Sequence, residues 1–141
     1  MEIFDRKYAG ALLVTSRGGV LMQRRDDKIG IQNPGLVTTF GGLVETGEKP
    51  EQTLLRELKE EVSLSLSAQD VSFFKIFNKN KETHGEDTTC YIYLVKNFDQ
   101  GTIEVREGQG YIEVSKNDDL NRVKLSRLAR EILEEYFHCE S

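Results

Sequence analysis

The sequence predicts an α/β fold in which a mixed β-sheet lies between helices. Short runs rich in β-branched and aromatic residues alternate with polar turns along the chain. Two segments show helical spacing of apolar residues, one near the middle of the chain and one at its end. This mixture of strands with two helices is typical of an α/β sandwich. The length of 141 residues suits a single domain over residues 1–141 with its own hydrophobic core.

The first forty residues predict strands separated by turns. Apolar runs bounded by glycine-rich or polar segments are typical of buried strands. On the second strand, alternation places Gln23 and Arg25 on one face and Arg24 on the other. Strands are expected at residues 8–15, 20–24 and 36–40, with a turn at 16–19, a loop at 26–35 and a glycine-rich turn at Gly41 and Gly42.

The central segment predicts a helix that begins at Pro50, because proline suits the first helical position. Its apolar stripe consists of Leu54, Leu55, Leu58 and Val62. Glu57, Glu60 and Glu61 fall together on an adjoining face, where like charges cost about 0.2–0.5 kcal/mol per pair. Two interpretations stay open from these residues alone: a solvated acidic face, or a site for a divalent cation with oxygen ligands such as Mg2+.

The second half of the chain predicts further strands and a closing helix. Asn78 to Asp87 is expected to be a mobile loop with His84 on its surface, whereas Cys90 is expected in the core. Either Ser126 or the cluster at 117–119 is expected to cap the last helix. Strands are expected at 71–77, 88–95, 102–106 and 111–114, a turn at 97–101, and a helical stripe of Leu125, Leu128, Ala129, Ile132, Leu133 and Tyr136.

Composition excludes several classes of protein. The formal net charge of −5 argues against sequence-independent nucleic-acid binding, which needs a basic surface. No apolar run has the length of a membrane span, and the N-terminus lacks the apolar core of a signal peptide. Cys90 and Cys139 are not spaced as a metal pair or a disulfide framework, so a reduced, cytoplasmic setting is expected. A homodimer is left open.

The residues from Gly42 to Leu64 resemble the signature of the Nudix hydrolases. Every position of that signature matches except one, where this chain has Ser63 and the family has glycine. A glycine just past a helix end usually adopts a left-handed conformation, which costs a non-glycine residue about 1 kcal/mol or more. Alternatively, the helix ends a little differently here. The matching residues are Gly42, Glu48, Arg56, Glu57, Leu58, Glu60, Glu61 and Leu64.

The resemblance implies a Nudix-type α/β/α sandwich and a metal-dependent diphosphatase. Enzymes of this family hydrolyse a nucleoside diphosphate linked to a group X, and water attacks one phosphorus. Carried over by position, Glu60 and Glu61 become ligands of Mg2+ or Mn2+, and Glu57 is a ligand or the general base. The carbonyl of Gly41 is a further metal ligand, while Glu48 and Arg56 resemble the structural pair that fixes the loop to the helix.

Three residues outside the signature complete the expected site. Arg24 or Arg25 is expected to reach a substrate phosphate, although an arginine on a solvated strand end is an equal alternative. Glu107 resembles the family's acidic loop residue and is the second candidate for catalysis, with a solvent-facing loop residue as its alternative. The expected partner is a small phosphorylated nucleotide, whose nucleoside and group X no motif identifies.

Two other functions stay open for a chain with this signature. A Nudix-fold module that only binds or senses a nucleotide is the main alternative, but such members often lose signature glutamates, which this chain retains. A prenyl diphosphate isomerase on the same fold would need its own catalytic cysteine and glutamate, and the sequence places neither.

Overall fold

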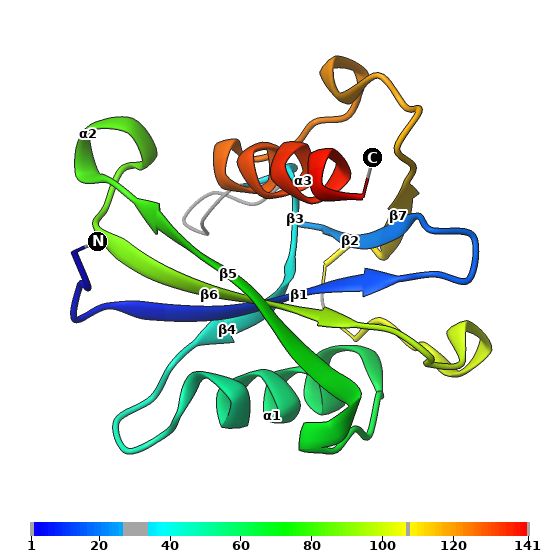
Figure 1. Cartoon of the computed structure of the whole chain (residues 1–141), viewed down its shortest axis with the longest axis horizontal. Helices are drawn as coiled ribbons and strands as arrows, with labels where there is room; N and C mark the ends of the chain where they lie inside the picture. The colour runs from blue at the N-terminus through cyan, green and yellow to red at the C-terminus, as the bar shows by residue number, and fades with distance from the viewer. Residues whose placement is uncertain (1, 27–33, 107, 141) are drawn as a thin grey trace.

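Seven strands form one mixed sheet in the computed structural model, which describes residues 2–26, 34–106 and 108–140. Helix α1 (Pro50–Val62) covers one face of the sheet and helix α3 (Arg127–Cys139) covers the other (Figure 1). The predicted α/β sandwich with a mixed sheet between helices is therefore confirmed. Within the described residues, no helix combines the length and apolarity needed to cross a bilayer.

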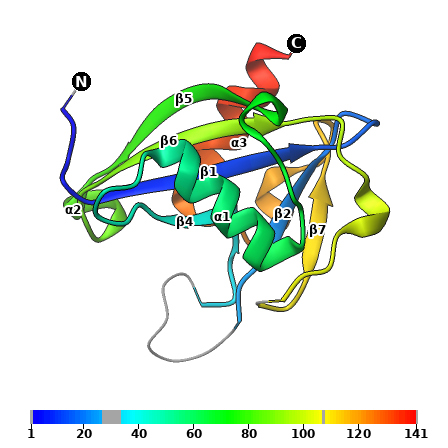
Figure 2. The same cartoon turned by 90° about the horizontal axis from the view of Figure 1, so that it is seen from below.

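Strand β1 (Lys7–Val14) occupies the centre of the sheet. It pairs in parallel with β6 (Thr88–Val95) and antiparallel with β2 (Val20–Arg24), which makes the sheet mixed. The strand order is β3-β2-β1-β6-β5, with β4 paired to β1 and β7 paired to β2. The remaining strands are β3 (Val37–Thr38), β4 (Phe40–Leu43), β5 (Val71–Lys79) and β7 (Tyr111–Val114). Figure 2 shows β7 beside β2, away from β5.

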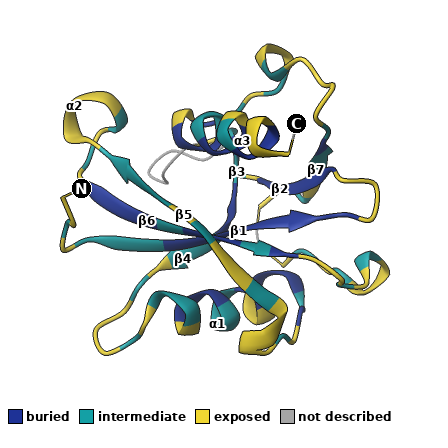
Figure 3. Ribbon diagram, in the orientation of Figure 1, coloured by how far each residue is buried: buried dark blue, intermediate teal, exposed yellow. Residues whose placement is uncertain are grey.

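A hydrophobic core lies on each face of the sheet. Successive side chains of a strand point to opposite faces, so Leu12 joins the core under α3 while Leu13 joins the core under α1. Both side chains are fully buried, as are most residues of β1 and β6 (Figure 3). This burial on both faces explains why the sequence of β1 is a continuous apolar run rather than an alternating one.

Helix α1 begins and ends as the sequence predicts. Pro50 is its first residue, and the Lys49 N–H just before it donates a hydrogen bond to Gln52 Oε1 at 2.9 Å. Ser63 follows the last turn in a left-handed conformation, with φ 62° and ψ 28°. Its N–H bonds the Leu58 carbonyl, but its buried Oγ has no hydrogen-bond partner among the described residues. The serine therefore occupies a glycine-type position.

Replacing Ser63 with glycine is expected to stabilise the fold by about 1 kcal/mol, because glycine adopts the left-handed conformation without steric cost. The change also removes a buried hydroxyl that lacks a partner. Urea denaturation measures the free energy of unfolding. The matched control is Ser63→Ala, which removes the hydroxyl but keeps the steric cost and should gain less. A glycine variant less stable than wild type would show that the hydroxyl makes a stabilising contact.

The glycine-rich turn predicted at Gly41 and Gly42 is wrong, because both residues lie inside strand β4. Gly41 pairs with Gly10 of β1, and Gly42 pairs with Ala9. The single strand predicted at 36–40 is likewise divided, since β3 pairs with β2 and β4 pairs with β1. The glycines here allow β4 to approach its neighbours closely rather than to reverse the chain.

The loop predicted from Asn78 to Asp87 is also wrong. Strand β5 continues to Lys79, and a short helix α2 (Lys81–His84) follows, ending at Gly85 with φ 93°. In Figure 1, α2 lies at the end of β5 and β6 where the chain begins. The segment therefore forms a defined structure beside the sheet, which matters for the position of His84.

The strand predicted at 102–106 does not form. A 3-10 helix η2 (Gln100–Thr102) comes first, and the next residues run alongside the end of α1. The Glu104 N–H donates to the Val62 carbonyl at 3.2 Å, and the Arg106 N–H donates to the Glu61 carbonyl at 2.8 Å. The last carbonyls of a helix have no N–H partner within the helix. The amides of Glu104 and Arg106 supply that partner here.

The remaining connections are short. Two more 3-10 helices, η1 (Ala68–Asp70) and η3 (Leu120–Arg122), precede β5 and α3. Of the two predicted caps for α3, Ser126 is the one used, because its Oγ accepts a hydrogen bond from the Ala129 N–H at 3.1 Å. Cys90 is fully buried in the core, as predicted, and burial raises the pKa of its thiol to about 12.

Candidate functional site

Helix α1 places its three clustered carboxylates in different environments. Glu61 is only 3% exposed, whereas the side chain of Glu57 is 20% exposed and that of Glu60 is 60% exposed. Glu57 and Glu61 are one helical turn apart and both lie next to strand β4. The structure therefore brings these two together at the sheet and leaves Glu60 at the outer surface.

Two glycines of β4 bring the backbone against these carboxylates. The Gly41 N–H donates a hydrogen bond to Glu61 Oε1 at 3.2 Å. A side chain on Gly42 would place its Cβ 2.5 Å from the carboxyl carbon of Glu57. A side chain on Gly41 would place its Cβ 2.1 Å from the carbonyl oxygen of Ala9. Gly41 therefore requires glycine for the close contact of β4 with β1, and the lack of a side chain at Gly42 lets Glu57 lie against the β4 backbone.

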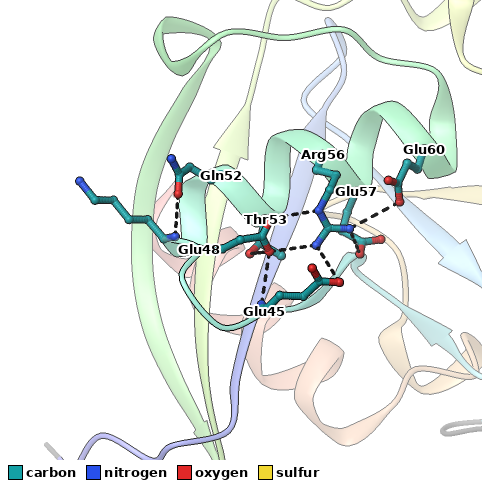
Figure 4. Close-up of polar contacts among 8 residues, drawn as sticks. Glu45, Glu48, Gln52, Thr53, Arg56, Glu57 and Glu60 are labelled. Carbon is teal, nitrogen blue, oxygen red and sulfur yellow. Dashed lines mark hydrogen bonds and ion pairs between the residues drawn. The ribbon is translucent and has the colours of Figure 1, made fainter.

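Arg56 lies at the centre of a network of carboxylates on the outer side of α1 (Figure 4). Its Nε and Nη2 donate to the two oxygens of Glu48, each at 3.0 Å, in a bidentate pair. Its Nη1 lies 3.0 Å from Glu57 Oε1 and 3.5 Å from Glu60 Oε2. One guanidinium thus offsets repulsion among the carboxylates and holds the loop before α1 onto the helix.

The hydrogen bond from Arg56 lowers the pKa of the Glu48 carboxyl from 4.5 to about 2, and a second hydrogen bond from Thr53 Oγ1 acts in the same direction. A lowered pKa in the folded state favours the ionised form. The contribution to stability is therefore present above pH 4.5 and is lost as the pH falls toward 2.

Glu48→Gln is expected to lower the free energy of unfolding at pH 7, and the difference from wild type should shrink as the pH falls from 4.5 toward 2. Urea denaturation across this pH range measures both proteins. Glu104→Gln is the matched control, because Glu104 is exposed and has no ion-pair partner among the described residues. A difference between wild type and Glu48→Gln that does not change with pH would contradict the assignment.

The donors present fit a hard divalent cation. Glu57 and Glu61 supply carboxylate oxygens on the side of α1 that faces Gly41 and Gly42, and Mg2+ prefers such oxygen ligands. As they stand, the described histidine, cysteine and acidic side chains include no group of three that could hold a metal ion. Glu60, which contacts Arg56, would have to turn inward to act as a third carboxylate ligand.

A cavity of about 420 Å3 opens beside the two glycines. Arg25 lines it together with Gly41 and Gly42, whereas Arg24 is exposed and is not among its lining residues. Strand alternation thus separates the two arginines, and of the two only Arg25 lines the cavity. Gln23, on the same face of β2 and only 2% exposed, also lines the cavity and was not among the predicted site residues.

Two further lining residues were missed from the sequence. Tyr8 donates a hydrogen bond to the Thr39 carbonyl at 3.1 Å, and burial raises the pKa of its hydroxyl well above the usual range. His84 was predicted on the surface, which is wrong, because its side chain is 4% exposed. No sequence signal singled out either residue, since each stands alone in its segment.

The hydrogen bonds of His84 determine its tautomer when neutral. The Asn80 N–H donates to Nδ1 at 3.1 Å, so Nδ1 is an acceptor and Nε2 carries the proton. Nε2 lies 2.9 Å from Glu131 Oε1 of α3. The histidine therefore connects α2 to α3 above the cavity. Glu107, the other predicted catalytic residue, lies outside the described residues.

Comparisons with known proteins bear on the family of the chain and on its fold. The family model described as NUDIX domain matches residues 5–136. An RNA pyrophosphohydrolase of Gluconacetobacter diazotrophicus is 37% identical over 60 residues, which are 40% of this chain and 36% of that protein. The aligned stretch thus spans little more than a third of that curated relative.

Solved structures match over nearly the whole chain. A MutT protein from Methanosarcina mazei has a TM-score of 0.76 at 20% identity, covering 99% of this chain and 97% of that one. The NUDIX domain of Shewanella oneidensis NrtR, complexed with ADP ribose, has a TM-score of 0.74 at 17% identity, covering 96% and 88%. At these identities the likeness shows the shared fold.

Proposed function

The chain belongs to the NUDIX domain family, and on this premise we propose that it is a metal-dependent pyrophosphohydrolase. Its substrate would be a nucleoside diphosphate linked to a further group X, such as a nucleoside triphosphate or a nucleotide sugar. The family match confirms the resemblance noted in the sequence and supports hydrolysis of a diphosphate linkage in general terms. The metal, the substrate and the roles of single residues are our proposal.

The observation that carries the proposal is the contact between the α1 carboxylates and the β4 glycines beside a cavity. The buried Glu61 accepts a hydrogen bond from Gly41, Glu57 packs against Gly42, and both glycines line the cavity. Neither carboxylate lines the cavity itself, but a carboxylate pair in contact with two of its glycines is where the diphosphate of a bound nucleotide can meet a cation. A module that only binds nucleotides has no need for this pair, so the arrangement favours an enzyme.

Each residue then has a specific role. Glu57 and Glu61 would hold Mg2+ or Mn2+, with Glu60 and the Gly41 carbonyl as further ligands. Such an ion supplies, when bound, neutralisation of the diphosphate and a lowered pKa of bound water. Arg25 would orient a phosphate in the cavity. Arg56 would keep Glu57 and Glu48 in place without contacting the substrate.

A panel of nucleotides tests the proposed function. Purified protein is incubated with nucleoside triphosphates, ADP-ribose and other nucleotide sugars, with Mg2+ or with EDTA, and phosphate-bearing products are measured. We expect turnover of at least one compound that depends on the divalent ion. Tight binding of a compound with no turnover under any condition would instead favour the nucleotide-binding module.

Glu57 and Glu107 are the candidate bases, and their glutamine variants distinguish them. Glu57 is fixed on α1 beside Glu61, so Glu57→Gln should lower turnover more than Glu107→Gln, because it disturbs both the metal site and the attacking water. Glu107→Gln should lower turnover moderately with little change in KM, as for a residue that acts from a catalytic loop. Steady-state kinetics at saturating Mg2+ measure both. A more damaging Glu107→Gln would make Glu107 the base, and a Glu107→Gln that matches wild type would remove it from the mechanism.

A further inference from the structure

The residues that line the cavity beside the β4 glycines carry more positive than negative charge, although Arg127 lies 3.7 Å from Glu131 of its own helix. The chain as a whole is acidic, with a formal net charge of −5. Among the described residues that line the cavity there are four cationic side chains and no aspartate or glutamate. The cations are Arg6, Arg25, Lys79 and Arg127. A cavity of this kind selects ligands that carry negative charge or many acceptor atoms.

Two of these cations, Arg6 and Lys79, lie beside the first residues of β6 and form what we term the far wall of the cavity. Lys79 ends β5 and pairs with Thr88, the first residue of β6. Lys79 lies on β5, which is three strands away from the strand of Gly41 and Gly42 in the order β4, β1, β6, β5. At the usual strand spacing, three strands correspond to about 14 Å. A phosphate at this far wall would therefore be a different group from the diphosphate at the glycines.

At the far wall, two cationic side chains lie near a single carboxylate, so the charges there do not cancel. Arg6 Nε lies 3.1 Å from Glu86 Oε2, and Lys79 Nζ lies 4.0 Å from Glu86 Oε1. One carboxylate thus faces two cations, and Lys79 is only 15% exposed. The charge of Lys79, which is largely shielded from solvent, therefore acts more strongly than a charge in open water.

A buried hydroxyl at the same wall has no partner. Thr88 lines the cavity and is 2% exposed, and its Oγ1 has no hydrogen-bond partner among the described residues. A buried hydroxyl without a partner is unfavourable unless a ligand or water completes it. The N-terminus of α3, from Ser126 to Ala129, also lines the cavity. The first N–H groups of a helix favour an anion, because they have no acceptor within the helix.

We propose that the wall formed by Arg6, Lys79 and Thr88 binds a phosphate group that the substrate carries outside the diphosphate to be cleaved. This inference rests on the proposed function, because it assumes that the diphosphate lies at Gly41 and Gly42. The preferred substrates are then nucleotides with an additional phosphomonoester on the nucleoside or on group X. Arg6 and Lys79 bind its oxygens as cations, and the Thr88 hydroxyl donates one hydrogen bond.

Matched ligand pairs that differ by one phosphate test the proposal. Coenzyme A and dephospho-coenzyme A form one pair, and NADPH and NADH form the other. Isothermal titration in EDTA measures binding without turnover, so its outcome is independent of the hydrolysis panel. We expect the phosphorylated member of at least one pair to bind about tenfold tighter, the usual effect of a hydrogen bond to a charged group. Equal binding within both pairs, or no binding of any member, would overturn the proposal.

Variants assign the preference to this wall. Thr88→Val keeps the shape and removes only the unpartnered hydroxyl, and Lys79→Gln removes one charge. Both should reduce the preference within the pair to about twofold or less. Lys116→Gln is the matched control, since it removes one charge from an exposed residue beyond the end of β7. A preference that survives Thr88→Val and Lys79→Gln would overturn the assignment.

Inorganic phosphate distinguishes a substrate phosphate from a free anion. It is titrated into wild type and Thr88→Val under the same conditions. Weak binding, at least tenfold weaker than the phosphorylated ligand, supports recognition of a phosphate joined to a nucleotide. Binding of inorganic phosphate as tight as that of the nucleotide, and lost in Thr88→Val, would reassign the wall to a free anion.

Discussion

Replacing Glu61 with glutamine is expected to reduce turnover by at least an order of magnitude, which is about 1.4 kcal/mol or more of transition-state stabilisation. Glu61 is 3% exposed, and its Oε1 accepts a hydrogen bond from Gly41. Glutamine has the same shape and can still accept that bond, so the fold should be retained. The change removes the charge that a divalent cation would require.

The measurement is kcat and KM at saturating Mg2+, followed by a titration of activity against Mg2+. A loss of metal affinity should raise the Mg2+ concentration needed for half-maximal turnover. Glu51→Gln provides the matched control, because Glu51 lies in the first turn of the same helix, away from the β4 glycines. Near-normal turnover of Glu61→Gln at ordinary Mg2+ concentrations would exclude Glu61 as a metal ligand.

Replacing Gly41 with alanine is expected to destabilise the protein by about 3 kcal/mol or more, the upper end of the usual cost of overpacking. The new Cβ would lie 2.1 Å from the carbonyl oxygen of Ala9 and 2.7 Å from Cα of Gly10. Both are backbone atoms of β1, so no side-chain rotation can relieve the contact. The φ of Gly41, 153°, is also one that residues with a side chain rarely adopt.

Thermal and urea denaturation measure this effect, with Gly47→Ala as the control. Gly47 has a positive φ of 85°, but a Cβ added there meets nothing within 4 Å. That variant should lose only about 1–2 kcal/mol, the conformational cost alone. Equal stability of the two variants would mean that β4 can move away from β1 and that the close packing at Gly41 is dispensable.

Elements with a strong local signal were predicted from the sequence. Helix α1 was predicted from the proline at its start and from its apolar stripe, and it begins at Pro50 as expected. Strand β6 was predicted from its β-branched run, and its bounds match the prediction. A left-handed conformation at Ser63 was one of two expectations, because the Nudix resemblance placed glycine there, and the structure confirms it. These features depend on residues close together in the chain, so the sequence alone determines them.

Features that depend on distant partners were not predicted. Residues 102–106 alternate like a strand, but their amides bond to the carbonyls at the end of α1 rather than to a neighbouring strand. Gly41 and Gly42 suggested a turn, although their role is close packing against β1 and Glu57. In each case the deciding partner lies far away in the sequence, where local pattern carries no information.

The candidate site shows the same division. The signature identified Glu57, Glu60 and Glu61 together, but it did not show that Glu61 is buried against β4 while Glu60 is exposed beside Arg56. His84 was assigned to the surface because a lone histidine in a charged segment gives no sign of burial. Its contact with Glu131, on the last helix, depends on a partner that is distant in the sequence.

The hydrogen bonds from Glu104 and Arg106 to the end of α1 have a consequence for local unfolding. Opening of this segment would expose the Glu61 and Val62 carbonyls, and fraying of the helix end would release the segment's amides. The two therefore form one cooperative unit, although they are distant in sequence. A fluctuation that begins in the segment from Glu104 to Arg106 or at the end of α1 shifts the last turn of the helix, which carries Glu61. The local stability of this segment therefore limits how long the Glu61 carboxylate keeps its position.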